Sequence, residues 1–238
     1  MNTFDKYVIA SLKLVKTQII TLVVCYIATV ISAGLILNTD ILFAGGISVI
    51  MMIMSIVVLV QQVLVYKKIC YDSLYGSDAV LYNQFPVNGE ETVAGKILAM
   101  AIVFLLEIPF LLIPMMFLGD SYEMESFLMT VPLADTGAGM LLSTISWIIS
   151  GIAGEALILY AVIYYNTPWK ESSKRTRLIF SVILVLVGMQ LTGNLPEILE
   201  KFLENSLLAS AVQSVLSLAV LVAAFQAAVK RLKNSYQI

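Results

Sequence analysis

Long apolar segments are the feature that most limits how this chain can fold. An α-helix rises about 1.5 Å per residue and a bilayer core is about 30 Å thick, so a membrane-spanning helix needs about 20 mostly apolar residues. The segments near this length, of which the fifth is short and the fourth long, are Gln18–Leu37, Leu42–Tyr66, Ile97–Leu118, Ala138–Tyr165, Leu178–Gly193 and Leu207–Ala228. The sequence therefore predicts an all-α, polytopic membrane helix bundle of about six spans, forming a single domain over residues 1–238.

The composition argues against a soluble fold and against several classes of enzyme. Of the 238 residues, 60% are hydrophobic and 13% are charged, whereas about a quarter of the residues in a soluble domain are charged. The chain contains no histidine, which removes the usual zinc ligand and the commonest general base. We therefore expect no catalytic, cofactor-binding or metal-binding residues in this chain, and no nucleic-acid partner.

The distribution of lysine and arginine predicts the orientation, because loops rich in these residues stay in the cytoplasm. With a cytoplasmic N-terminus, 13 of the 14 basic residues lie on that side: Lys6, Lys13, Lys16, Lys67, Lys68, Lys96, Lys170, Lys174, Arg175, Arg177, Lys230, Arg231 and Lys233. The external segments then contain Lys201 and the acidic residues Asp40, Asp120, Glu123, Glu125, Asp135, Glu197, Glu200 and Glu204. We therefore expect a cell-membrane protein with both termini in the cytoplasm.

Two amphipathic helices are predicted beside the spans. Within residues 1–17, side chains that recur at helical spacing are Phe4, Tyr7, Val8, Ser11, Leu12 and Val15. This pattern indicates a helix in the cytoplasmic membrane interface, with an extension of the first span as the alternative. A second, external helix is indicated by the apolar residues Leu195, Ile198, Leu199, Phe202 and Leu207, which alternate with charges.

The cytoplasmic loop at residues 67–96 has more local structure signals than a connector needs. Asn88 and Glu91 form a capping-box pattern, which predicts a helix running through Lys96 into the third span. Cys70 lies in this polar loop and Cys25 lies in the first span, so we expect no disulfide. The segment from Gly89 to Lys96 is not a phosphate loop, because five residues separate its glycines and Ile97 replaces the required Ser or Thr.

The segment LYGSDAVLYNQFPVNGEETVAGKI, residues 74–97, resembles the permease subunits of type-2 ABC exporters, particularly the six-span peptide and lantibiotic-immunity permeases of Gram-positive bacteria. The shared pattern is a Leu-Tyr-Gly turn, an apolar dipeptide, a Pro-Val step and a polar helix start that ends in Gly-Lys. Phe85 stands where the family more often has Leu. The motif covers 24 residues, and the predicted topology extends the likeness over the whole chain.

The resemblance implies that this loop docks on a separate cytoplasmic ATP-binding subunit. The residues expected to contact that subunit are Tyr71, Leu74, Tyr75, Asp78, Leu81, Tyr82, Phe85 and Pro86. Exposed aromatic side chains are favoured anchors of protein interfaces, although these could instead pack against the chain's own spans or lie among lipid headgroups.

The resemblance also implies partners and a substrate class. A second permease, identical or related, would pair with this chain, and ATP with magnesium would bind in the partner ATPases. The exported substrate would be hydrophobic or amphipathic: a peptide, a drug or a lipid. From the residues alone, a non-transport membrane protein such as an assembly factor or sensor subunit is the runner-up, and a channel or secondary transporter comes third.

Two acids lie inside predicted spans, Glu107 in the third and Glu155 in the fourth. An unpaired charge there costs about 2.5 to 3.5 kcal/mol, so neither should face lipid. They could line a substrate path or a subunit interface, or be protonated and hydrogen-bonded to a neighbouring helix. Small residues that recur at helical spacing are Ser150, Gly151 and Gly154 in the fourth span and Ser210, Ser214, Ser217, Ala224 and Ala228 in the sixth. They predict close helix packing within the chain, with a dimer contact as the alternative.

Overall fold

The computed structural model describes residues 3–36, 53–54, 56–58, 60–76, 78–79, 87–118, 137–167, 173–192 and 194–236. Within these ranges the chain is helical, with turns and no strand, so the all-α prediction is confirmed for them. The elements are α1 (Thr3–Leu14), α2 (Lys16–Ile36), the π-helix η1 (Lys67–Asp72), α5 (Gly89–Leu118), α6 (Gly137–Asn166), α7 (Lys174–Thr192), α8 (Asn194–Leu203) and α9 (Ser206–Tyr236).

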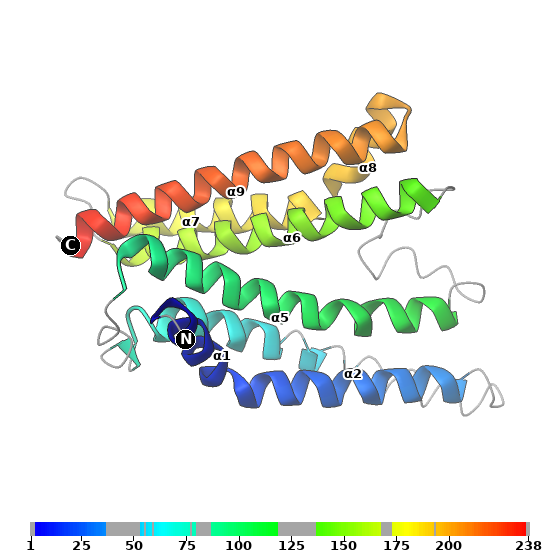
Figure 1. Ribbon diagram of the computed structural model, residues 1–238, viewed down its shortest axis with the longest axis horizontal. Helices are drawn as coiled ribbons and strands as arrows, with labels where there is room; N and C mark the ends of the chain where they lie inside the picture. Colours follow the sequence, from blue (N-terminus) through cyan, green and yellow to red (C-terminus); the bar gives the residue numbers. More distant parts are fainter. Residues whose placement is uncertain are drawn as a thin grey trace.

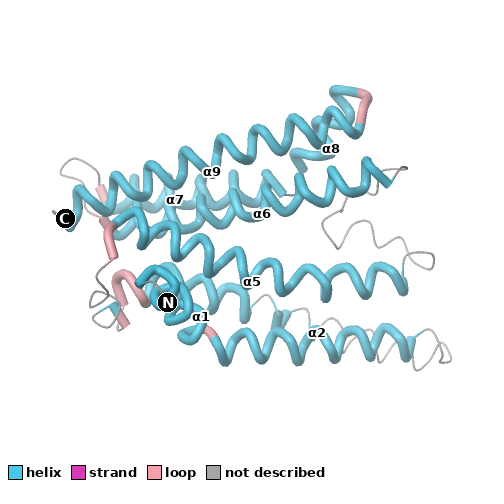
Figure 2. Tube along the Cα trace, in the orientation of Figure 1, coloured by secondary structure: helices cyan, strands magenta, loops and turns pink. Residues whose placement is uncertain are grey.

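The long helices lie beside one another along the long axis of the molecule, and the chain reverses direction between α5 and α6 and again between α6 and α7 (Figure 1). Figure 2 shows the short helix α8 at one end and the two marked chain ends toward the other. Both termini therefore lie toward the same end of the bundle, as the predicted orientation requires.

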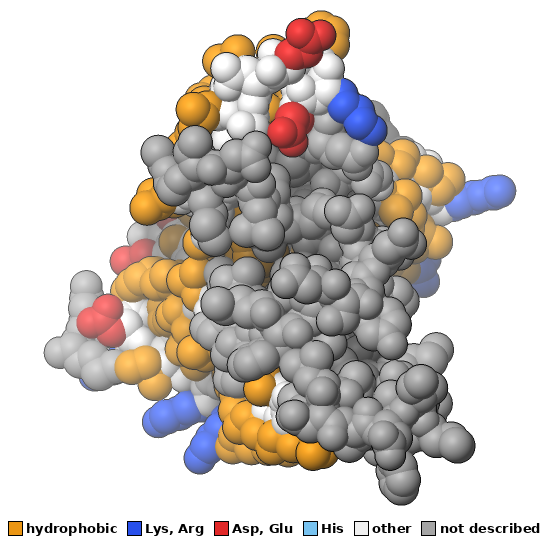
Figure 3. Space-filling model, turned by 90° about the vertical axis from the view of Figure 1, so that its right-hand side faces the viewer, with side chains coloured by type: hydrophobic (Ala, Val, Ile, Leu, Met, Phe, Trp, Pro, Cys, Tyr) orange, Lys and Arg blue, Asp and Glu red, His pale blue; other side chains and the backbone are white. Residues whose placement is uncertain are grey.

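By length and composition, two helical stretches among the described residues could cross a membrane, Leu141–Asn166 and Ser206–Asn234. The bent pair α1 and α2 adds a third if it counts as one span. The fourth and sixth predicted spans thus coincide with candidate spanning helices, and the count of six stays a prediction. Figure 3 views the molecule along the bundle and shows apolar side chains at its left and right margins. The large apolar side chains exposed on α7 are those of Leu178, Ile179, Phe180, Val182, Ile183, Leu186, Val187 and Met189.

The helix α5 begins where the capping box predicts. The Asn88 N–H donates to Glu91 Oε2 at 3.0 Å, and the Glu91 N–H donates to Asn88 Oδ1 at 2.8 Å. These reciprocal bonds satisfy two backbone donors that a helix start would otherwise leave unpaired. The helix continues through Lys96 to Leu118, so both parts of this prediction are confirmed.

The predicted N-terminal helix is α1, which meets α2 at a 58° bend; its position in the membrane interface stays a prediction. Its buried side chains are those of Tyr7, Val8 and Ser11, all on the predicted apolar face. Part of this face packs on protein, because a Cβ on Gly95 of α5 would lie 2.8 Å from Tyr7 Cδ1. The absence of a side chain at Gly95 is therefore what lets α1 lie against α5.

The predicted helix between the fifth and sixth spans is α8. Its apolar residues Ile198 and Phe202 are exposed and lie one turn apart. The helix is followed by Glu204, whose φ of 51° is in the left-handed region, a conformation common just after the last residue of a helix. The chain then reverses into α9, whose first turn is capped by the Leu208 N–H donating to Asn205 Oδ1 at 3.0 Å.

Helices α6, α7 and α9 pack closely through the small residues that the sequence singles out. A Cβ on Gly154 of α6 would lie 3.2 Å from the backbone oxygen of Gly188 in α7. The hydroxyls of Ser150 and Ser217 are 2.8 Å apart between α6 and α9, and Gln213 Nε2 donates to Ser150 Oγ at 3.0 Å. The prediction of close packing within the chain is confirmed; the alternative dimer contact is not tested by these contacts.

Candidate functional site

Two carboxyl groups lie buried where α5 and α6 face the helix before η1. Glu107 of α5 is 6% exposed and Glu155 of α6 is 3% exposed, so neither faces lipid, as predicted. Gln62 Nε2 donates to Glu107 Oε2 at 2.8 Å, and Tyr66 Oη donates to Glu155 Oε1 at 3.2 Å. Gln62 and Tyr66 are four residues apart, so one face of a single helix holds both acids.

A fifth polar side chain completes this group, which we call the acid cluster: Tyr26, Gln62, Tyr66, Glu107 and Glu155. Tyr26 comes from α2, is buried, and lies within electrostatic range of Glu107 and Gln62. The two carboxyl groups are also close enough to influence each other. Carboxyls buried in this way mark proton or substrate sites in membrane proteins, because each can hold a proton or accept a bond from an ammonium group.

The sequence analysis identified the two acids of this cluster and missed their partners. The available signal was the pair Gln62 and Tyr66, which places polar groups one helical turn apart within an otherwise apolar run. That spacing predicts a polar face on the helix. It does not predict which helices pack against that face.

A second buried polar group lies between the acid cluster and the end of the bundle that carries the termini. Lys96 is fully buried. Its Nζ donates to Ser73 Oγ at 2.6 Å and to Ser11 Oγ at 3.4 Å, and it lies 5.0 Å from the centroid of the Tyr7 ring. We call these four residues the lysine clamp, because they join α1, the turn after η1, and α5.

Burial changes the acid–base behaviour of Lys96 in the lysine clamp. Lys96 lies one residue before the predicted third span, and burial lowers the pKa of its amine to about 7. Removing an ammonium group from water is costly unless other groups replace the water. The hydroxyls of Ser11 and Ser73 and the face of the Tyr7 ring do so here.

The segment after Tyr66 differs from the prediction. We expected a polar loop from Lys67 onward, but the helix continues as η1 through Asp72. Cys70 is fully buried, with its Sγ 3.3 Å from Met100 Sδ of α5, because Ile69 and Cys70 belong to a hydrophobic core that also includes Leu159 of α6 and Leu232 of α9. Burial raises the pKa of the Cys70 thiol to about 12. Both cysteines, Cys25 and Cys70, are free, as predicted.

Four of the residues expected to contact an ATPase are described. Tyr71 is exposed, and Tyr75 and Asp78 are half-buried. Leu74 is only 7% exposed, because it packs into the same core as Cys70, so it follows the alternative of packing against the chain's own helices. The remaining expected contacts lie outside the described residues: Leu81, Tyr82, Phe85 and Pro86.

Within the described part of the chain, no group of three or more Cys, Asp or Glu side chains is placed to hold a metal ion. Comparisons of this chain with protein-family models, curated proteins and solved structures find no match. What the site can do must therefore be argued from its own residues.

Proposed function

We propose that this chain is the membrane-spanning permease subunit of a type-2 ABC exporter. It has six spans and two cytoplasmic termini, and it pairs with a second permease, identical or related. Two ATP-binding subunits supply ATP and magnesium, and the assembly exports a hydrophobic or amphipathic substrate. The resemblance of residues 74–97 and the distribution of basic residues support this proposal.

The observation that carries the proposal is the continuous helical connection between the acid cluster and the start of the loop. The helix that holds Glu107 and Glu155 through Gln62 and Tyr66 continues directly into η1. The next exposed aromatic side chain is that of Tyr71, five residues after Tyr66. A push on Tyr71 by a cytoplasmic partner would therefore be transmitted along one helix to both acids.

The lysine clamp keeps that connection stiff. Ser73, in the turn after η1, is tied by Lys96 to α5, and Ile69 is buried at the same place. An energy-coupling element needs this property, because a loose loop would absorb the motion of the ATPase instead of passing it to the spans.

The first test is whether the neighbouring reading frame encodes an ATP-binding subunit, and the second is co-purification of the full chain with that subunit. Truncating an interface anchor costs about 2 kcal/mol, close to a thirtyfold loss of affinity. We expect the Tyr71→Ala/Tyr75→Ala variant to insert normally and to lose the ATPase. The matched control is Ile198→Ala/Phe202→Ala on α8, at the opposite end of the bundle (Figure 1), which should retain it. Equal retention by both variants would contradict the coupling role.

The orientation has its own test. In a chain without Cys25 and Cys70, single cysteines at Asp120 and Glu200 should react with an impermeant thiol reagent in intact cells. A cysteine at Lys174 should react only after the cells are opened. Equal labelling at all three positions would contradict the proposed topology.

The acid cluster favours one other candidate, a secondary transporter driven by protons, because two adjacent buried carboxyls can load and release a proton. Transport measured with an ATPase variant unable to hydrolyse ATP separates the two. Loss of transport supports the exporter, and transport that survives but stops with a protonophore supports the second candidate.

A further inference from the structure

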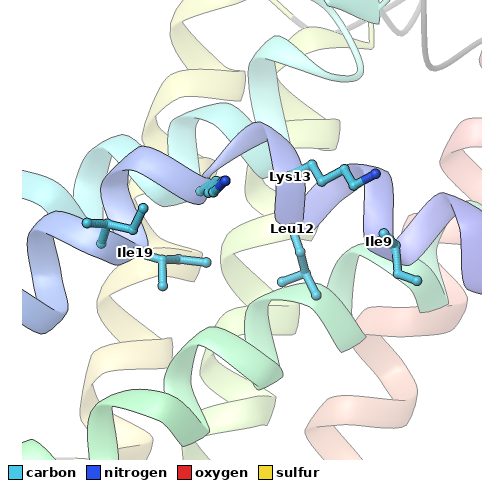
Figure 4. Close-up of a pocket in the computed structure, with 6 residues that line it drawn as sticks. Ile9, Leu12, Lys13 and Ile19 are labelled. Carbon is cyan, nitrogen blue, oxygen red and sulfur yellow. The ribbon is translucent and has the colours of Figure 1, made fainter.

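The bend between α1 and α2 forms an open, shallow pocket that the proposed function does not use. It has a volume of about 240 Å³ and is lined by Ile9, Leu12, Lys13, Lys16, Ile19 and Ile20. Figure 4 shows Ile9, Leu12 and Ile19 along the bend, with the Lys13 side chain extending beside them. The pocket therefore combines an apolar floor with two basic residues, one on each side of the break at Val15.

The two lysines are available to a ligand. Both are exposed, and neither forms an ion pair or hydrogen bond with another described residue. Other lysines of the same end differ: Lys68 Nζ donates to Gln18 Oε1 at 3.3 Å, and Lys233 pairs with Glu90 at 2.7 Å. The floor is also incompletely covered, since Ile9 and Ile20 are exposed.

We propose that this elbow pocket binds one anionic phospholipid of the cytoplasmic leaflet. The headgroup phosphate lies between the ammonium groups of Lys13 and Lys16, and the first part of an acyl chain lies on the isoleucines. A lysine at a membrane interface extends its apolar stem along the hydrocarbon and its charge toward the headgroups, where basic residues attract anionic lipids.

The chemistry of the lining selects this ligand over others. A free phosphate ion would gain nothing from Ile9, Leu12, Ile19 and Ile20, and a zwitterionic lipid has no net charge to match two lysines. An anionic phospholipid satisfies both halves of the pocket. The proposal rests on the proposed orientation, in which α2 enters the membrane from the cytoplasm near Lys16, and it does not depend on ATP coupling.

The experiment titrates the full chain, purified in detergent, with phosphatidylglycerol or with phosphatidylcholine of the same acyl chains. Native mass spectrometry measures the bound lipid. We expect phosphatidylglycerol to bind more tightly, and Lys13→Gln/Lys16→Gln to weaken it about thirtyfold. The matched control is Lys6→Gln/Lys67→Gln, which removes two exposed lysines that do not line the pocket and should change the affinity less than about threefold.

Two further variants separate the parts of the site. Lys13→Arg/Lys16→Arg should keep the preference, because both charges remain. Ile20→Ser should weaken phosphatidylglycerol about tenfold with both lysines intact, because the acyl chain loses part of its floor.

Three results would overturn the proposal. Equal affinity for the two lipids would show that charge is not recognised. Equal loss in the Lys13/Lys16 and Lys6/Lys67 variants would show diffuse attraction without a pocket. Displacement of the lipid by inorganic phosphate at similar concentration would show a simple anion site.

Discussion

The two halves of this molecule are held together by different means. In α6, α7 and α9, small residues bring the backbones close, as at Gly154 and Gly188. In α1, α2, η1 and α5, buried polar side chains tie the elements together, as Lys96 does with Ser73. Close backbone contact admits one arrangement, because packed interiors transmit strain. Side-chain hydrogen bonds also join α6 and α9, as at Ser150 and Ser217, but there they accompany close contact between backbones. We therefore treat the first half named as the scaffold and propose that the second half carries the coupling to the ATPase.

Disrupting the close packing of α6 and α7 should have the largest effect on the yield of folded protein. Gly154→Leu places a branched side chain where a Cβ alone would lie 3.2 Å from the Gly188 oxygen. Overpacking costs about 1 to 3 kcal/mol or more, and here the obstacle is backbone. We expect little folded protein after detergent extraction, measured by size-exclusion chromatography. Val182→Leu, on the exposed side of α7, is the matched control and should behave as wild type.

Breaking the acid cluster should have an intermediate effect that can be reversed. Glu107→Leu removes the acceptor that Gln62 uses, and an unpaired buried donor costs about 1 to 3 kcal/mol. Replacing Gln62 by Leu as well removes both partners and should restore most of the thermal stability, whereas Glu107→Gln should change stability little. Export should be lost in all three variants. If export survives with stability intact, the acid is only a packing group.

Breaking the lysine clamp should loosen the loop without unfolding the bundle. In a Cys25→Ser background, wild-type Cys70 should resist maleimide at pH 7.5, because it is buried and its pKa is raised to about 12. Lys96→Met keeps the apolar stem and removes the amine. We expect labelling to become at least about tenfold faster, which corresponds to a loss of about 1.4 kcal/mol in the cost of local opening. Unchanged labelling would show that apolar packing alone holds the loop.

Removing an ion pair on the surface should have the smallest effect on thermal stability. Lys233 and Glu90 form an ion pair at 2.7 Å, with side chains that are 46% and 58% exposed. Exposed pairs contribute at most about 1 kcal/mol and are weakened by salt. Lys233→Ala should therefore leave the melting temperature within about four degrees of wild type. A larger shift would mean that this contact between α5 and α9 joins the two halves more strongly than its exposure suggests.

Features that depend on neighbours within a turn or two of helix could be predicted from the sequence. The capping box at Asn88 and Glu91, the separate helix α1 and the close-packing role of Ser150 and Gly154 all follow from local spacing, and the structure has them. Such features are predictable because the interacting groups are a fixed few residues apart, so backbone geometry alone brings them together.

Which side chains far apart in the sequence come into contact depends on how the helices pack. The Gln62 and Glu107 pair is 45 residues apart and the Tyr66 and Glu155 pair is 89 residues apart, so neither follows from periodicity. For the same reason the polar pattern around Lys67 predicted a loop, whereas packing against α5 extends the helix as η1 and buries Leu74. The residue type sets how strongly a side chain is solvated by water. The helices packed around the side chain determine whether it is exposed to water.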